Sequence, residues 1–113
     1  MAQSLIVLVT CSSVAEARLI ANSVVESRLA ACTNLLPGVV ESVYRWQGRV
    51  EKARERLLVI KTTRRSFPPL RDSIRRMHSY QVPEIIAFPI SAGLPTYLRW
   101  IEDSVSSRRK GRR

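Results

Sequence analysis

The residues Leu5-Ile6-Val7-Leu8-Val9-Thr10 are apolar without a break until the last one, and the architecture of the chain is built around them. A continuous apolar run of this length predicts a strand that is buried on both faces of a sheet. The segments Leu57–Thr63 and Ile85–Ile90 have the same character and predict two more strands of this kind. A sheet built around these three strands needs cover on both of its faces.

Three helices are expected around these strands. Ser13-Val14-Ala15-Glu16 has the spacing of a capping box, and the apolar residues that follow recur at helical period, which predicts a helix over Val14–Leu29. Ser66 can cap a second helix that carries Pro68 and Pro69 in its first turn. Pro95 begins a third helix, which is expected to turn four apolar side chains inward: Tyr97, Leu98, Ile101 and Val105.

The remaining strand signals complete an α+β order. Ala31–Leu36 predicts a strand, Pro37-Gly38 interrupts it, and β-favouring residues resume over Val39–Trp46 before a turn at Gln47-Gly48. The order is therefore β-α-β-β-α-β with a C-terminal helix. Right-handed crossovers then predict a ferredoxin-like sheet with strand order 4-1-3-2 and both long helices on one face.

The segment from Val39 to Arg56 is longer than any core strand and predicts an extended hairpin arm. At roughly 3.3 Å per residue, about eight residues on each side reach about 25 Å beyond the body. An isolated ribbon is marginal in water, and two long helices cannot cover both faces of an apolar sheet. We therefore expect both the arm and the uncovered face to pack against further copies of the chain.

Length and composition indicate one compact domain over residues 1–107, because 113 residues with 45% hydrophobic content can bury a substantial core. The net charge is +10, and the tail 108–113, expected to be disordered, carries five of the cations. The N-terminus has no charged flank before its short apolar run, and no run approaches the roughly 20 apolar residues of a membrane span. We expect a cytoplasmic protein without a membrane partner.

The loop His78-Ser79-Tyr80-Gln81-Val82-Pro83-Glu84 is the main candidate site, since it places an imidazole, a phenol and a carboxylate before a strand. In the predicted topology Cys11 ends the first strand near His78, whereas Cys32 and Lys61 lie at the opposite end of the sheet. A disulfide between the two cysteines is therefore not expected.

A thiolate and an imidazole suit copper or zinc, and a third ligand would come from a neighbour, from Glu84 or from water. Two alternatives stay open. His78 and Tyr80 could fix the loop by hydrogen bonds, or the loop could line a cleft for a small molecule or anion. Trp46 at the arm tip is expected to pack in a neighbour or to stack on a ligand.

Seven motifs in order resemble a known family, the trimeric CutA1 divalent-cation tolerance proteins, whose fold is similar to that of PII signalling proteins. The motifs are Val9-Thr10-Cys11, Arg28-Leu29-Ala30-Ala31-Cys32, Leu36-Pro37-Gly38, Ser42-Val43-Tyr44-Arg45-Trp46-Gln47-Gly48, Lys61-Thr62-Thr63, the His78–Glu84 loop and Gly93-Leu94-Pro95-Thr96-Tyr97-Leu98. The resemblance implies a homotrimer that binds copper, another divalent cation or a small ligand between subunits, in a signalling or homeostasis role. It raises Lys61 to a candidate cleft residue beside Trp46, His78, Tyr80 and Glu84, while His78 and Cys11 are the candidate metal ligands that the sheet topology indicates.

Some positions depart from the family pattern. Serine stands at Ser12 and Ser79, where the family usually has proline, and the acidic run after the hairpin is reduced to Glu51 and Glu55. A basic chain also repels divalent cations at long range. Two other functions remain as alternatives: a nucleic-acid-binding module that uses the basic tail, and a thiol-dependent enzyme, which would require a depressed pKa of Cys11. No catalytic motif accompanies the single histidine, so we expect neither an enzyme nor a dedicated nucleic-acid partner.

Overall fold

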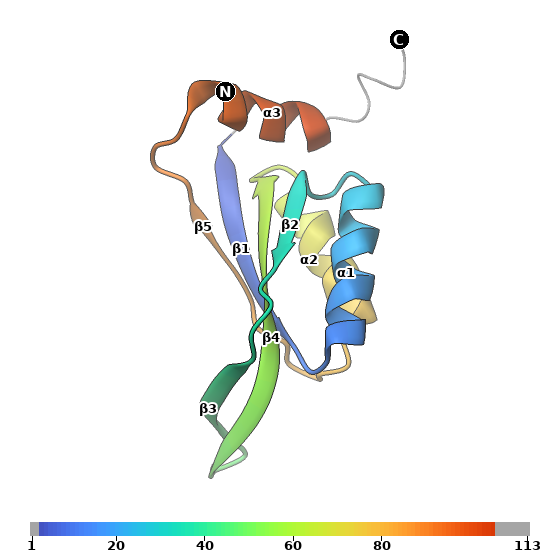
Figure 1. Ribbon diagram of the computed structural model, residues 1–113, viewed down its shortest axis with the longest axis vertical. Coiled ribbons are helices and arrows are strands. Elements are labelled where there is room, and N and C mark those ends of the chain that lie inside the picture. The colour runs from blue at the N-terminus through green and yellow to red at the C-terminus, as the bar shows by residue number, and fades with distance from the viewer. Residues whose placement is uncertain (1–2, 106–113) are drawn as a thin grey trace.

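The computed structural model describes residues 3–105, so the predicted tail at 108–113 and its boundary with the domain lie outside the described residues. The elements follow the expected order (Figure 1). Their bounds are β1 Ser4–Cys11, α1 Val14–Glu26, β2 Cys32–Leu35, β3 Val40–Trp46, β4 Arg49–Thr63, α2 Phe67–Met77, β5 Ile85–Pro89 and α3 Pro95–Val105. The central hairpin consists of two short strands, β2 and β3, that both pair with one long strand, β4. No helix among these residues is long and apolar enough to cross a membrane.

The five strands form one sheet in which every pairing is antiparallel. The spatial order is β2-β4-β1-β5, and β3 pairs with the N-terminal half of β4, from Arg49 to Glu55. This agrees with the α+β class and the strand order expected from the sequence. In the register Cys11 lies opposite Arg56 at one end of the sheet, while Cys32 lies opposite Lys61 toward the other end. Both cysteines are free thiols, as predicted.

One face of the sheet carries the hydrophobic core. Alternate side chains of β1 and β4 point to this face and are fully buried, among them Val9 and Ile60. Helices α1 and α2 both pack here, through fully buried residues such as Ile20 and Ile74 (Figure 1). The 3.6-residue period of the helices and the two-residue period of the strands therefore meet in one core.

The capping signal at Ser13 is confirmed, because its hydroxyl accepts a hydrogen bond from the backbone N–H of Glu16. Helix α1 ends at Glu26, three residues before the predicted end. Arg28 has a left-handed backbone with φ of 62°, and the next two N–H groups both donate to the carbonyl of Val24. This left-handed residue ends the helix, although the apolar residues at helical spacing continue to Leu29.

One expectation about the other helices is wrong. Ser66 precedes α2, but its side chain makes no capping hydrogen bond; Pro68 and Pro69 have no N–H groups that need a cap. Tyr97 of α3 is only partly covered: it is 40% exposed, its ring centroid lies 5.4 Å from that of Trp100, and burial together with the neighbouring Cys32 raises the pKa of its phenol. Helix α3 lies across one end of the sheet, and Ile101 is its only fully buried residue within 95–105 (Figure 1).

The hairpin arm is present, and it is formed by β3 and the first half of a continuous β4. Its turn is made by Gln47 and Gly48, both with positive φ, which is the backbone that a tight two-residue hairpin turn requires. The arm projects from the body in Figure 1 and accounts for the molecule's long dimension of 51 Å.

The second face of the sheet, called here the open face, lacks the cover that α1 and α2 give to the core face. Its residues are Ile6 and Leu8 of β1, Leu57 and Val59 of β4, and Ile86 and Phe88 of β5. The first four are half-buried, while Ile86 and Phe88 are 52% and 45% exposed. The expectation of an apolar face without its own helical layer is confirmed for one chain.

Candidate ligand pocket and the adjoining histidine cluster

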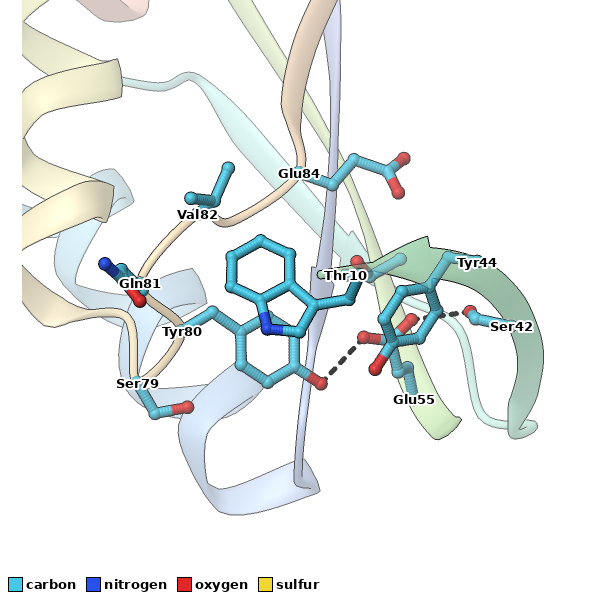
Figure 2. A pocket seen from close by; sticks show the side chains of 10 residues that line it. Thr10, Ser42, Tyr44, Glu55, Ser79, Tyr80, Gln81, Val82 and Glu84 are labelled. Atoms are coloured by element: carbon cyan, nitrogen blue, oxygen red, sulfur yellow. Dashed lines mark hydrogen bonds between the residues drawn. The ribbon is translucent and has the colours of Figure 1, made fainter. Parts of the chain in front are cut away.

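A pocket of about 460 Å³ lies where the arm joins the body, at the edge of the open face. Strands β1, β3 and β4 form one side of it, and the loop between α2 and β5 forms the other (Figure 2). Its lining residues are Thr10, Ser42, Tyr44, Trp46, Glu55, Ser79, Tyr80, Gln81, Val82 and Glu84. The volume lies in the range of small-molecule sites, roughly 300–1,000 Å³.

Glu55 is the most buried charged group of the pocket wall, with only 6% of its surface exposed. The hydroxyl of Tyr80 donates to its Oε2 over 2.7 Å, and the hydroxyl of Ser42 donates to its Oε1 over 2.5 Å (Figure 2). Burial, together with the hydrogen bond to Glu55 and the charge of that carboxylate, raises the pKa of Tyr80. The Tyr80 phenol is therefore neutral and acts as a donor to Glu55 at physiological pH.

His78 lies directly behind the pocket loop and its side chain is completely buried. Its Nε2 is 2.8 Å from the carbonyl oxygen of Thr10, and its Nδ1 accepts a hydrogen bond from the N–H of Tyr80 over 3.1 Å. Since a carbonyl can only accept, Nε2 carries the proton. Both ring nitrogens thus hold the loop against β1, which is the loop-fixing role left open by the sequence.

Cys11, Glu16 and His78 form a cluster in which one ligand atom from each residue lies within 4.8 Å of the other two. The predicted approach of Cys11 to His78 is confirmed. The third member is Glu16 rather than Glu84. The sequence signal at Glu16 is the capping-box spacing, which predicts the start of a helix and does not place the carboxylate beside residue 78.

The Glu16 carboxylate ties two loops together. It accepts hydrogen bonds from the N–H groups of Ser79 (2.6 Å) and Ser12 (3.1 Å) and from the hydroxyls of both serines. Burial alone would raise the pKa of Glu16, but these hydrogen bonds outweigh it and place the pKa below the ordinary value of 4.5. The two serines that depart from the family's usual proline are therefore the partners of this carboxylate.

Sulfur, imidazole and carboxylate are a chemically suitable donor set for copper or zinc. As arranged, however, the set does not fit an ion. The lone pair of His78 Nδ1 accepts the Tyr80 N–H, and burial together with the charges of Glu16 and Glu55 raises the pKa of Cys11 to about 12. A metal ion would have to displace a hydrogen bond and a thiol proton. A raised thiol pKa is also the opposite of what the thiol-enzyme alternative requires.

The structure brings together three of the five residues predicted for the cleft. Trp46, Tyr80 and Glu84 line the pocket, and His78 supports it from behind. Lys61 lies elsewhere: it is opposite Cys32 in the β2–β4 ladder and donates a hydrogen bond to Asn34. Glu55 was missed as a site residue, because its only signal was membership in the shortened acidic run.

The chain is thus a small α+β protein with helices on one sheet face and a ligand-sized pocket at the edge of the other. Residues 5–104 match the model of a family described as CutA1 divalent ion tolerance protein. The chain belongs to this family, as its sequence motifs indicated.

Two relatives and one solved structure support the assignment. The "Divalent-cation tolerance protein CutA" of Thermus thermophilus is 48% identical over 88% of this chain and 95% of its own length. The "Protein CutA, chloroplastic" of Arabidopsis thaliana is 44% identical over 89% of this chain, which spans 55% of that longer relative. The solved structure of the divalent cation tolerance protein (Cut A1) from Thermus thermophilus has a TM-score of 0.86 at 46% identity, covering 89% of this chain and 97% of its own.

Proposed function

We propose that three copies of the chain assemble through their open faces and arms and bind a small ligand in the pocket, which then lies at the boundary between subunits. The observation that carries this proposal is the position of the pocket. Thr10 and Glu55 line it, and both continue the open face along β1 and β4, so a neighbour that covers this face also reaches the pocket. The protein would act by binding, in a PII-like signalling or homeostasis role.

The exposed apolar side chains support the assembly. Ile86 and Phe88 on the sheet and Val43 and Val50 on the arm are all large, apolar and exposed. Large apolar side chains left exposed on both the sheet and the arm mark interaction surfaces, and identical partners are the commonest solution for soluble proteins. The number of copies, three, rests on the resemblance to the family.

A divalent cation, copper included, remains the second candidate ligand, but the Cys11–Glu16–His78 cluster could hold one only by giving up the Tyr80 hydrogen bond and the thiol proton. The proposal favours the pocket, because its lining groups are available without breaking the hydrogen bonds that hold His78. We do not propose catalysis: the buried Cys11 thiol is protonated at neutral pH, and His78 uses both nitrogens in structural hydrogen bonds.

Sedimentation velocity at micromolar concentration tests the assembly, with and without a chelator. We expect the mass of three chains in both conditions, because apolar burial and not metal holds the copies together. A stable monomer would contradict the proposal, and a trimer that dissociates in chelator would make metal the organising element. The cytoplasm is the compartment that we propose, and cell fractionation of the tagged full chain tests it.

A further inference from the structure

We propose that the pocket selects a small organic cation, namely an ammonium group carried on an apolar body. This inference rests on the proposed function, since it names the ligand class for the same pocket. It comes from the charge, burial and aromatic content of the wall, taken in that order.

The charge of the wall is opposite to that of the chain. The protein has 19 lysine and arginine residues against 9 acidic ones, yet the ten lining residues include the carboxylates Glu55 and Glu84 and no lysine, arginine or histidine. An anionic ligand would meet two carboxylates and no cation in this wall. The small-anion alternative left open by the sequence is therefore disfavoured, and a cation is the ligand that the wall attracts.

Glu55 adds a stronger reason, because it is a buried charge without a countercharge. Both of its oxygens accept hydrogen bonds, but the donors, Tyr80 and Ser42, are neutral hydroxyls. Among residues 3–105, no lysine, arginine or histidine forms an ion pair with Glu55. Removing a carboxylate from water is costly unless a positive charge offsets it, and each oxygen keeps a lone pair for a further donor. A ligand ammonium group supplies both the charge and the donors.

The aromatic side chains suit the rest of such a ligand. Tyr44, Trp46 and Tyr80 all line the pocket, and the apolar Val82 lies with Tyr80 on the loop side (Figure 2). Aromatic faces attract cations, with tryptophan the most effective, and they also pack against apolar groups. Since burial, and after it the hydrogen bond to Glu55, raises the pKa of Tyr80 and keeps the phenol neutral, its ring adds no charge of its own at physiological pH.

A bare metal ion fits this wall less well. Calcium takes six to eight oxygen ligands, and magnesium demands octahedral coordination. Among the described residues, the one group of three metal-ligating side chains is Cys11, Glu16 and His78, so Glu55 and Glu84 do not converge with a third such residue. Two separate carboxylates beside three aromatic rings favour an organic cation over an inorganic one.

Isothermal titration calorimetry on the full chain tests the inference with three probes of similar shape: 2-phenylethylammonium, 2-phenylethanol and 3-phenylpropanoate. We expect the cation to bind at least about tenfold more tightly than the alcohol, and the anion to bind most weakly. Glu55→Gln should weaken binding of the cation about 30-fold and leave the alcohol unchanged, because only the charge is lost. Glu84→Gln, at an exposed position, should weaken it about threefold.

Two further variants complete the design. Trp46→Leu should weaken the cation about tenfold through loss of the aromatic face. Glu41→Gln is the matched control for the two glutamate variants, because Glu41 is an exposed carboxylate of β3 that pairs with Arg54 and does not line the pocket; it should bind as the wild type does. Sedimentation and thermal melting of each variant establish that it is folded and assembled.

The outcomes separate this inference from the proposed function. If the anion binds best, or if folded Glu55→Gln and Glu84→Gln both bind the cation as tightly as the wild type, the ligand class is wrong. The pocket then stands as a binding site only if Trp46→Leu weakens the bound probe. If none of the three probes binds the wild-type protein, the organic-cation inference fails, and the pocket loses its support as the ligand site of the proposed function. A trimer in sedimentation would then still support the assembly.

Discussion

Replacing Phe88 by aspartate tests whether the open face is a subunit interface. Phe88 is 45% exposed in one chain and lies opposite Ile6 in the β1–β5 ladder. A phenylalanine side chain has on the order of 200 Å² of surface, so about 90 Å² remains for a neighbour to cover. At about 25 cal/mol per Å², covering it stabilises the assembly by about 2 kcal/mol per subunit, or about 6 kcal/mol for three.

The loss corresponds to roughly four powers of ten in the dissociation constant of the trimer, and a carboxylate at the interface adds a desolvation cost. We expect Phe88→Asp to sediment as a monomer at concentrations where the wild type is a trimer. The matched control is Leu19→Asp, since Leu19 is exposed at 58% on α1, the helix on the opposite face of the sheet. A Phe88→Asp protein that remains trimeric, with its circular dichroism unchanged, would refute the reasoning.

The other predictions concern the core and the histidine cluster. Ile74→Ala should lower the free energy of unfolding by about 2–5 kcal/mol in urea titrations, because Ile74 is fully buried in the core; a loss below about 1 kcal/mol would contradict that packing. Glu16→Gln should destabilise the protein at neutral pH. The pKa of Glu16 in the folded protein lies below its ordinary value of 4.5, so the stabilisation by the Glu16 charge is complete above pH 4.5 and is lost as the pH falls through the folded pKa. The melting temperatures of the wild type and Glu16→Gln should therefore converge in acid. A difference in melting temperature that stays constant with pH would exclude the charge as the cause. Iodoacetamide at neutral pH should modify Cys11 far more slowly in the native protein than in urea, as followed by mass spectrometry in a Cys32→Ser background; equal rates would mean that the thiol is open to solvent. Copper(II) and zinc(II) should bind wild type and His78→Ala with similar affinity in calorimetry, and a tenfold loss in the variant would assign His78 to a metal site.

Much of the fold was accessible from local patterns. The apolar runs at β1 and β5 and the helical period of α1 each report burial within one element, so they predicted the elements and, through chain order, the arrangement of the sheet. That arrangement in turn predicted that Cys11 meets His78. The end of α1 was missed, because it depends on the left-handed backbone of Arg28, a residue type with no preference for that conformation.

The site was only partly accessible. Tyr80, Trp46 and Glu84 were expected at the cleft because the loop and the arm tip concentrate polar and aromatic groups. Lys61 was expected there on the resemblance alone, and its position opposite Cys32 removes it from this pocket. No local signal indicated the role of Glu55, because a single glutamate in a long charged strand is typical of a solvated position.

The order of strands and helices, the apolar character of both sheet faces and the family follow from the residue pattern alone, because neighbouring residues encode each of them. The pairing of polar groups depends on the folded chain instead: Glu16 bonds with Ser79, 63 residues away, and Glu55 bonds with Tyr80, 25 residues away. Such contacts require placement to within a few tenths of an ångström. That precision comes from packing of the whole chain, and no periodic pattern encodes it.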